Sequence, residues 1–283
     1  MKKFLPAWWL TAVIALALGA LPAFAGGGNS DAAHACQQGG YTHYSRADGT
    51  PFANTGECVS YAAHGGVLRP KNTTAISTAL FKSTIPAGST DYDTATLTGA
   101  TADAGGHVTY YVYSDPTCTT LAQTAGTVLV YNGHVPDSFI TTFPTVGTYY
   151  WQAVYTGDAS NEPSASACDT EPLVVIPLTT PTITTALFKP TIPAGTTDYD
   201  TAMLTGATAT AGGHVTYYVY SDATCSTLVQ TAGKVLVHNG HVPNSFITTF
   251  PNAGTYYWQA VYTGDAYNEP AASACDAEPL IVT

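Results

Sequence analysis

The sequence predicts an all-β protein in which one β-sandwich domain occurs twice, and three observations support this. The second half of the chain repeats the first 107 residues downstream, so that Phe81 returns as Phe188 and Trp151 as Trp258. A repeat of this length has the size of a whole domain. Charged residues are scarce, whereas Thr and Tyr are abundant, a composition that suits strands. Within each copy, short β-branched and aromatic runs alternate with turn residues, which is typical of a two-sheet sandwich.

The first 25 residues are predicted to be a secretory signal peptide. Lys2 and Lys3 give a positive start, an apolar run follows at 10–21, and Ala23-Phe24-Ala25 fits a cleavage site. The apolar run is short for a membrane anchor, and no stop-transfer charges follow it. We therefore expect an exported protein, extracellular or associated with the cell surface, with no membrane insertion after the signal is cleaved.

The charge of the mature chain excludes one class of partner. Without Lys2 and Lys3 there are 8 − 2 = 6 basic residues against 19 acidic ones, a formal charge of 6 − 19 = −13. An acidic surface repels phosphate backbones and anionic lipids. No nucleic-acid partner is expected.

Four segments are expected after the signal. Residues 26–77 comprise a Gly-rich flexible lead at 26–33, a small module bracketed by Cys36 and Cys58, and a polar linker. The two repeats occupy residues 78–176 and 185–283. Between them, residues 177–184 carry Pro177 and Pro181, which favour an extended and fairly stiff connection.

The six cysteines are expected to form three disulfides, because an even number behind a signal peptide is typical of secreted proteins. Fifteen pairings are open in principle, but two copies of one domain should carry the same bond twice. The expected pairs are Cys118–Cys168, Cys225–Cys275 and, by remainder, Cys36–Cys58. Metal binding is the alternative, and it is disfavoured because no CxxC pair is present.

Strands in the first copy are expected at residues 77–82, 94–98, 107–113, 128–131, 138–143, 148–156 and 172–175. No stretch shows a helical period, so no helix is expected. Side chains alternate between the two faces of a strand, which separates a buried set from an exposed one. The predicted core is Val108, Tyr110, Val112, Tyr149, Trp151, Ala153 and Tyr155, with Leu97, Phe139 and Phe143 beside them.

Three segments of the first repeat carry a family resemblance. They read DTATLTG at 93–99, AGGHVTYYVY at 104–113 and GTYYWQAVYTGD at 147–158. They are similar to bacterial immunoglobulin-like repeats of the group 3 type, in the variant that bears a disulfide and occurs in secreted surface proteins. The resemblance covers both copies and implies immunoglobulin-like sandwiches, each with its disulfide tying the last strand to the end of the middle strand. It implies a stalk, an adhesin or an enzyme accessory rather than one function.

The N-terminal segment carries a second resemblance. The stretches from Cys36 to Tyr44 and from Phe52 to Tyr61 are similar to a short two-cysteine module of secreted bacterial proteins, with Tyr41 in place of a Trp and Thr55 in place of a Gln. The resemblance implies no particular activity. A segment this short cannot hold a large core, so we expect its disulfide to keep it folded.

No catalytic or cofactor motif is found. The chain lacks a Gly-x-Ser-x-Gly elbow, a phosphate-binding Gly-Lys-Ser/Thr loop and an HExxH pair. We expect neither enzymatic activity nor a cofactor. Calcium is a weaker alternative at the acidic stretches 91–93 and 157–162 and their copies, which include Asp198, Asp200, Asp265, Asn268 and Glu269, but the EF-hand spacing is absent.

Six tyrosines are the remaining binding candidates. They share the second face of two predicted strands and are Tyr111, Tyr113, Tyr150, Tyr218, Tyr220 and Tyr257. They would form an exposed stripe for contact with a sugar or a protein. The interpretation favoured by sequence alone is that they pack under loops or against a sheet edge.

The sequence thus predicts a secreted, non-catalytic protein whose tandem domains act as structural spacers or adhesion modules at the cell surface. The partner is unknown, with cell-surface polysaccharide or protein as the candidates. The alternative is a carbohydrate- or protein-binding protein with its site in the N-terminal Cys module and the repeats as a stalk.

Overall fold

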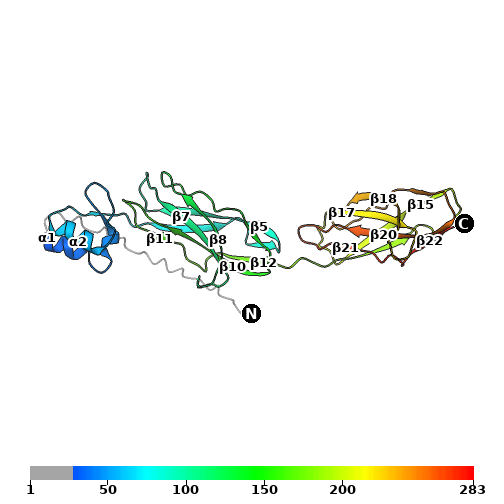
Figure 1. Cartoon of the computed structure of the whole chain (residues 1–283), viewed down its shortest axis with the longest axis horizontal. Coiled ribbons are helices and arrows are strands. Elements are labelled where there is room, and N and C mark those ends of the chain that lie inside the picture. The colour runs from blue at the N-terminus through cyan, green and yellow to red at the C-terminus, as the bar shows by residue number, and fades with distance from the viewer. Residues whose placement is uncertain (1–27) are drawn as a thin grey trace, which may run out of the picture.

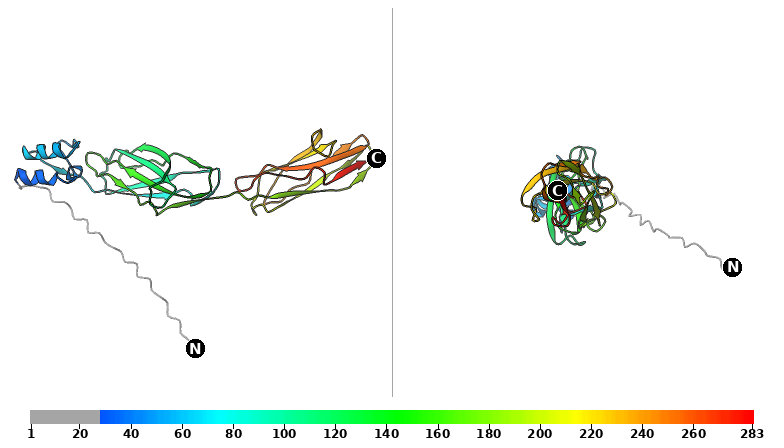
Figure 2. Two further views of the ribbon diagram at one scale, coloured as in Figure 1. Left: turned by 60° about the horizontal axis from the view of Figure 1, so that its bottom comes forward. Right: turned by 90° about the vertical axis from the view of Figure 1, so that its right-hand side faces the viewer.

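The computed structural model describes residues 28–283, so the predicted signal peptide lies outside the described residues. A small module that contains two helices comes first, and two β-sandwiches follow it (Figure 1). Figure 2 shows the three units in a row along one long axis.

The N-terminal module folds around a disulfide. Its elements are α1 (Asn29–Ala35), η1 (Gly40–His43), β1 (Tyr44–Ser45), α2 (Thr55–Ala63) and β2 (Arg69–Pro70). Its buried side chains are Cys36, Tyr44, Phe52, Cys58, Ala62 and Leu68. Two sequence predictions are wrong here: helices are present, and α1 begins inside the segment 26–33 that was expected to be a flexible lead.

The helix α2 begins at a cap that the sequence displays. The side chain of Asn54 accepts a hydrogen bond from the Glu57 backbone N–H at 2.9 Å, and the Glu57 carboxylate accepts one from the Ala53 N–H at 2.7 Å. This reciprocal arrangement resembles a capping box. The spacing Asn54-x-x-Glu57 was therefore a helix signal that the search for a long periodic pattern missed.

The strands of the two repeats match one for one. In the first repeat they are β3 (Ala75–Leu80), β4 (Thr84–Pro86), β5 (Ser89–Asp91), β6 (Asp93–Thr98), β7 (His107–Tyr113), β8 (Leu121–Leu129), β9 (Thr141–Phe143), β10 (Gly147–Tyr155), β11 (Ser164–Ala165) and β12 (Pro172–Ile176). In the second they are β13 (Thr182–Leu187), β14 (Thr191–Ile192), β15 (Thr196–Asp198), β16 (Asp200–Thr205), β17 (His214–Tyr220), β18 (Leu228–Leu236), β19 (Thr248–Phe250), β20 (Gly254–Tyr262), β21 (Ala271–Ala272) and β22 (Pro279–Val282).

Each repeat is a two-layer sandwich. One layer of the first repeat is the sheet β4-β12-β10-β7-β8, with β11 paired to β10, and the other consists of the ladders β3–β6 and β5–β9. β4 and β12 are parallel, and the other pairs are antiparallel. The second repeat has the same order, β14-β22-β20-β17-β18 against β13–β16 and β15–β19. The chain is therefore an all-β protein with two tandem immunoglobulin-like sandwiches, which confirms the predicted fold class.

The core lies between the layers and contains most of the side chains that alternation placed there. Trp151, Tyr110 and Tyr155 are fully buried, and Leu97 and Tyr149 pack against them while partly exposed. Burial of one large side chain stabilises the fold by about 1.5–3 kcal/mol. The predicted core includes Phe143, which is buried, but it is wrong for Phe139.

Phe139 is 61% exposed because it lies outside the sandwich. Its backbone N–H donates to the Ala125 carbonyl at 2.8 Å, which holds the segment beside β8. Its ring covers Gly126, where a Cβ would lie 2.7 Å from the ring. Gly126 has a φ of +101°, so both the backbone and the ring require glycine at this position.

Several predicted strand bounds also need correction. The strand expected at 128–131 is the end of the nine-residue β8, and only Thr141–Phe143 of the stretch 138–143 is a strand. The short strands β4, β5 and β11 were not predicted. The strand expected at 107–113 is confirmed as β7.

The segments that precede the two repeats contact them in the same way. Asn72 pairs with the loop of the first repeat, since its N–H donates to Ser160 and its carbonyl accepts from Glu162. Thr179 makes the equivalent bonds to Tyr267 and Glu269 of the second repeat. At the first junction, His43 of the module adds a side-chain hydrogen bond between its Nδ1 and the Glu162 carboxylate at 2.5 Å.

Candidate functional site

The tyrosine face is our name for the outer surface of the large sheet around Tyr111 and Tyr113 of β7 and Tyr150 of β10. These side chains point away from the core because Tyr110, Val112 and Trp151 between them point inward. All three are partly exposed. The rings of Tyr111 and Tyr113 lie 6.2 Å apart between centroids, and Tyr113 is directly opposite Tyr150 in the ladder.

The tyrosine face extends across four strands. Pro172 of β12 is opposite Tyr150, and Leu121 of β8 is opposite Tyr113. The order across the sheet is therefore Pro172, Tyr150, Tyr113 and Leu121, with Tyr111 and Gln152 in the next row. Leu121 is 52% exposed and adds an apolar side chain to the end of this row.

The second repeat carries the same tyrosine face. Its row is Pro279, Tyr257, Tyr220 and Leu228, with Tyr218 and Gln259 beside it. The rings of Tyr218 and Tyr220 are again 6.2 Å apart. The structure thus brings together the six tyrosines singled out in the sequence as two open surfaces, whereas sequence alone favoured packing under loops.

The chemistry of this face is that of an amphipathic contact surface. A tyrosine presents an apolar ring and a hydroxyl that donates and accepts hydrogen bonds. Partial burial raises the pKa of Tyr113, and the neighbouring Tyr111 and Asp115 add to the shift, so its hydroxyl keeps its proton at neutral pH. Rings of this kind stack on sugar faces and pack against protein side chains.

The end of the tyrosine face is fixed by a disulfide. Cys118, in the turn between β7 and β8, is bonded to Cys168, which precedes β12, with a Cα–Cα distance of 5.9 Å. Cys225 and Cys275 are bonded in the same way at 5.8 Å, and Cys36 is bonded to Cys58 in the module. The Cys118–Cys168 bond therefore ties the turn after β7 to the segment before β12, and the Cys225–Cys275 bond does the same for β17 and β22.

Asp115 orders the turn that contains Cys118. Its carboxylate accepts hydrogen bonds from the Thr117 hydroxyl at 2.5 Å and from the Thr120 N–H at 2.6 Å. The Thr117 hydrogen bond holds the pKa of Asp115 well below its usual range, and the backbone N–H groups of Thr119 and Thr120 act in the same direction. Asp222 holds the equivalent turn in the second repeat.

The acidic residues that were considered as calcium ligands are either buried or hydrogen-bonded to backbone N–H groups. Asp91 and Asp93 are buried, whereas the carboxylate of Asp158 accepts hydrogen bonds from the N–H groups of Gly105 and Asn161 at 2.8 Å. Within residues 28–283, no group of three or more His, Cys, Asp or Glu side chains is arranged to hold a metal ion. Protein donors, not open coordination positions, surround the Asp158 oxygens.

No protein-family model matches the chain, and no curated protein matches it in sequence. Among solved structures, it is similar to the *Escherichia coli* adhesin FdeC, with 17% identity over 77% of this chain and 68% of that one and a TM-score of 0.31. It is also similar to the *Yersinia pseudotuberculosis* adhesin InvE, with 13% identity over 70% of this chain and 58% of that one and a TM-score of 0.26.

A third similar structure contains the three N-terminal domains of the highly immunogenic outer capsid protein of bacteriophage RB49. It has 13% identity over 74% of this chain and 59% of that one, with a TM-score of 0.30. At TM-scores this low, the fold assignment rests on the strand pairing described above.

The described part of the chain was also searched for membrane-spanning segments. None of the helices in residues 28–283 has the length and hydrophobicity needed to cross a bilayer.

Proposed function

We propose that the protein is exported and acts without catalysis outside the cell, as a tandem adhesion or spacer protein at the cell surface. In this proposal residues 78–176 and 185–283 are repeats of the bacterial group 3 immunoglobulin-like type, joined by the linker 177–184. Residues 26–77 hold the Cys module, which includes α1, and the segment that leads into β3 of the first repeat. The partner is a surface polysaccharide or protein that contacts aromatic side chains.

One observation carries the adhesive role: the same tyrosine face is built twice. Two identical sites on one chain raise the affinity for a repetitive target by a factor of about 10²–10⁴ over one site, provided that both can bind together. The docking of Thr179 onto the second repeat shortens the free part of the linker, which favours simultaneous binding. Three disulfides support the extracellular location.

Replacing Tyr113 and Tyr220 with serine should weaken binding to the target surface at least tenfold. Each substitution removes the central ring of a row while leaving the core unchanged, since both side chains point outward. The measurement is binding of the mature chain to a glycan array and to extracellular-matrix proteins. Either single substitution should leave one intact tyrosine face, so the affinity should fall toward that of a single site.

Tyr131→Ser is the matched control, because Tyr131 is 71% exposed but lies in a turn away from the tyrosine face. It should bind as the unaltered chain does. Equal binding by the Tyr113→Ser/Tyr220→Ser variant and the unaltered chain would rule out the tyrosine face as the adhesive surface.

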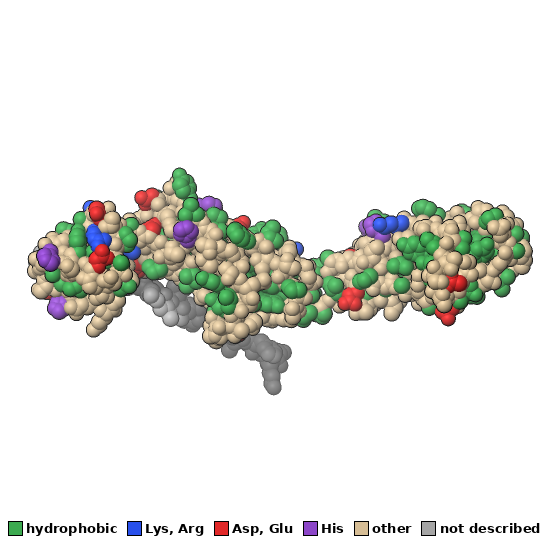
Figure 3. Space-filling view, viewed as in Figure 1, with side chains coloured by type: hydrophobic (Ala, Val, Ile, Leu, Met, Phe, Trp, Pro, Cys, Tyr) green, Lys and Arg blue, Asp and Glu red, His purple; other side chains and the backbone are tan. Residues whose placement is uncertain are grey.

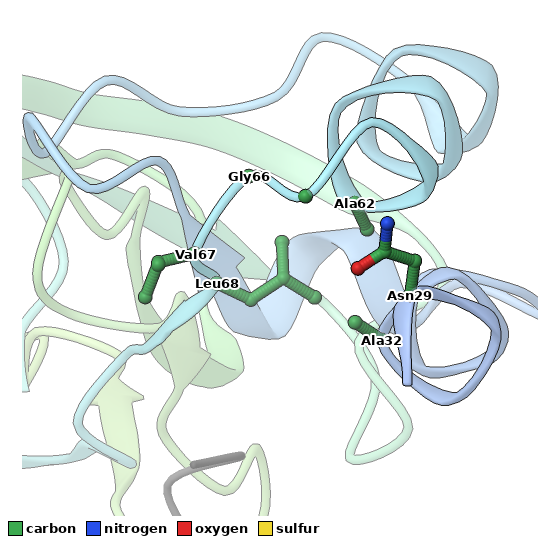
Figure 4. Close-up of a pocket in the computed structure, with 7 residues that line it drawn as sticks. Asn29, Ala32, Ala62, Gly66, Val67 and Leu68 are labelled. Carbon is green, nitrogen blue, oxygen red and sulfur yellow. The ribbon is translucent and has the colours of Figure 1, made fainter. Parts of the chain in front are cut away.

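A second candidate site is a cavity of about 170 Å³ in the N-terminal module. Figure 4 shows Leu68 pointing between the two helices, toward Ala62 of α2 and Ala32 and Asn29 of α1. This cavity favours the alternative in which the module holds a small ligand and the repeats project it. Deletion of residues 26–71, which leaves Asn72 and the whole of β3 in place, distinguishes the two: binding that survives deletion supports the repeats, and binding that is lost supports the module.

A further inference from the structure

The two repeats differ in charge at only four positions. Where residues 78–176 and 185–283 differ in a side chain that can be charged near neutral pH, the pairs are Asp103/Thr210, Thr127/Lys234, Tyr131/His238 and Asp137/Asn244. All four differences make the second repeat more positive. The first repeat has 1 basic and 9 acidic residues, a formal charge of 1 − 9 = −8, whereas the second has 2 − 7 = −5. Residues that both repeats share, such as Asp158 and Asp265, do not contribute to this difference.

In the second repeat these positions lie together at one end of the sandwich. Lys234 lies near the end of β18, where that strand pairs with the start of β17. The turn 238–241 follows β18, and its Gly240 N–H donates a hydrogen bond to the Ala211 carbonyl at 2.9 Å, which places the turn beside Thr210. Lys234 and both histidines of the turn are exposed. We call this surface the basic end, and its members are His214, Lys234, His238 and His241.

The same end of the first repeat has the opposite charge. The Gly133 N–H donates a hydrogen bond to the Ala104 carbonyl at 2.9 Å, so the turn 131–134 again lies beside the loop that contains Asp103. Asp137 comes three residues after this turn, and both aspartates are exposed. We call this surface the acidic end and define it by Asp103 and Asp137.

Both ends are open to another protein chain. β8 and β18 are edge strands of the two large sheets, so one side of each strand has backbone groups that are not paired within its sheet. Leu129 and Leu236 are each 59% exposed at the end of these strands and add an apolar contact beside the charged side chains. Figure 3 shows histidine side chains of both repeats on the same face of the molecule, with a lysine beside those of the second repeat. One partner surface can therefore reach both ends.

We propose that two copies of the chain associate antiparallel, with the acidic end of each first repeat against the basic end of the other copy's second repeat. Opposite charges then meet at both contacts, whereas a parallel pair would bring like charges together. A two-fold axis between the repeats produces both contacts at once, which closes the dimer. A different anionic partner would account for the basic end alone, whereas a second copy accounts for both ends.

The negative charge of the mature chain, 6 − 19 = −13, does not prevent this contact. Salt at about 0.15 M screens exposed charges from one another beyond about 8 Å. Repulsion between distant acidic residues of the two copies is therefore weak, while charges in direct contact still attract. The signs of the charges at the two ends then decide how the copies are oriented.

Analytical ultracentrifugation of the mature chain over a concentration series tests this proposal. The unaltered chain is expected to form a dimer. Lys234→Asp makes both ends negative, and Asp103→Lys with Asp137→Lys makes both ends positive, so each variant should dimerise at least tenfold more weakly. An equimolar mixture of the two variants should recover the dimer, because each end then meets an end of opposite charge.

Two controls separate this effect from a folding defect. Lys234→Thr with His238→Tyr gives the second repeat residues that the first repeat already carries in the same fold, and it should also dimerise at least tenfold more weakly. Lys189→Asp makes the same charge change as Lys234→Asp at the opposite end of the sandwich, beside β14, and should dimerise as the unaltered chain does. Tyr113→Ser/Tyr220→Ser should also leave the dimer unchanged, so the result does not depend on adhesion.

Three results would overturn the proposal. They are a chain that is monomeric at every concentration, a dimer that Lys234→Asp does not weaken, and a mixture of the two charge-reversal variants that stays monomeric.

Discussion

Replacing Asp93 and Asp200 with asparagine is expected to stabilise the protein at pH 8 and to destabilise it at pH 4. Burial raises the pKa of each carboxyl to about 8, and the negative charge of Glu171 or Glu278 adds to the shift. The backbone N–H groups of Ala79 and Thr94 approach Asp93 and oppose the shift, but neither makes a hydrogen bond of ordinary geometry to it. The folded state therefore favours the neutral acid.

The direction of the pH dependence follows from that preference. In the unfolded chain an aspartate has a pKa of about 3.9. The burial of Asp93 therefore does not lower the free energy of unfolding below about pH 4, but it lowers it progressively as the pH rises toward 8. At pH 7 the penalty is on the order of 4 kcal/mol in each repeat, at about 1.4 kcal/mol for each pKa unit. Asparagine has no charge at any pH, but its unpaired buried N–H donors cost about 1–3 kcal/mol.

Urea unfolding between pH 4 and pH 9 checks this prediction. The stability curves of the variant and of the unaltered chain should cross between those limits. Asp137→Asn is the control, because Asp137 is exposed and the equivalent residue of the second repeat is already Asn244. Parallel curves for Asp93→Asn/Asp200→Asn and the unaltered chain would show that the buried carboxyls are ionised in the folded protein.

The fold class was predictable because the strands that supply most core side chains show a regular alternation of buried and exposed residues. The β7 residues Val108, Tyr110 and Val112 alternate without interruption, and the predicted strand agrees with the structure. The neighbouring β8 was mostly missed, since its pairing with β7 shifts register between Thr109 and Tyr111 and again between Val112 and Tyr113. A bulge breaks the period of two on which the prediction depended.

The helices were missed for a different reason. α1 and α2 have seven and nine residues, too few for an apolar period to appear in the sequence. Their stability comes from packing on each other around the Cys36–Cys58 bond, which is a tertiary effect. The Asn54 cap was the local signal available.

The sequence displays only part of the tyrosine face. Alternation placed Tyr111, Tyr113 and Tyr150 on one side of the sheet, but their exposure depends on whether a loop covers them. The burial of Asp93 could not be predicted, because it depends on the pairing of β6 with β3, in which Asp93 lies opposite Leu80. Asp91 and Asp93 were calcium-ligand candidates only under the weaker alternative, and both are buried.

Replacing Cys118 and Cys168 with serine is expected to destabilise the first repeat by about 4 kcal/mol, because an unfolded loop of 50 residues is no longer closed. A domain has a typical stability of about 5–15 kcal/mol, so this loss is a large fraction of the total. Calorimetry should then show two separated transitions, with the first repeat unfolding at the lower temperature. The turn after Tyr113 would also lose the disulfide that fixes it. The first tyrosine face should then stop contributing, and the affinity of the whole chain for its target should fall to that of a single site.

The second repeat supplies the matched comparison. Cys225→Ser with Cys275→Ser removes a bond of the same loop length, 50 residues, and should lower the stability of the second repeat by a similar amount. Removal of both bonds should return the two transitions to nearly the same, lower temperature. If one bond can be removed without splitting the transition, the disulfide does not support its own sandwich, and the two repeats unfold as one cooperative unit whose stability comes from elsewhere.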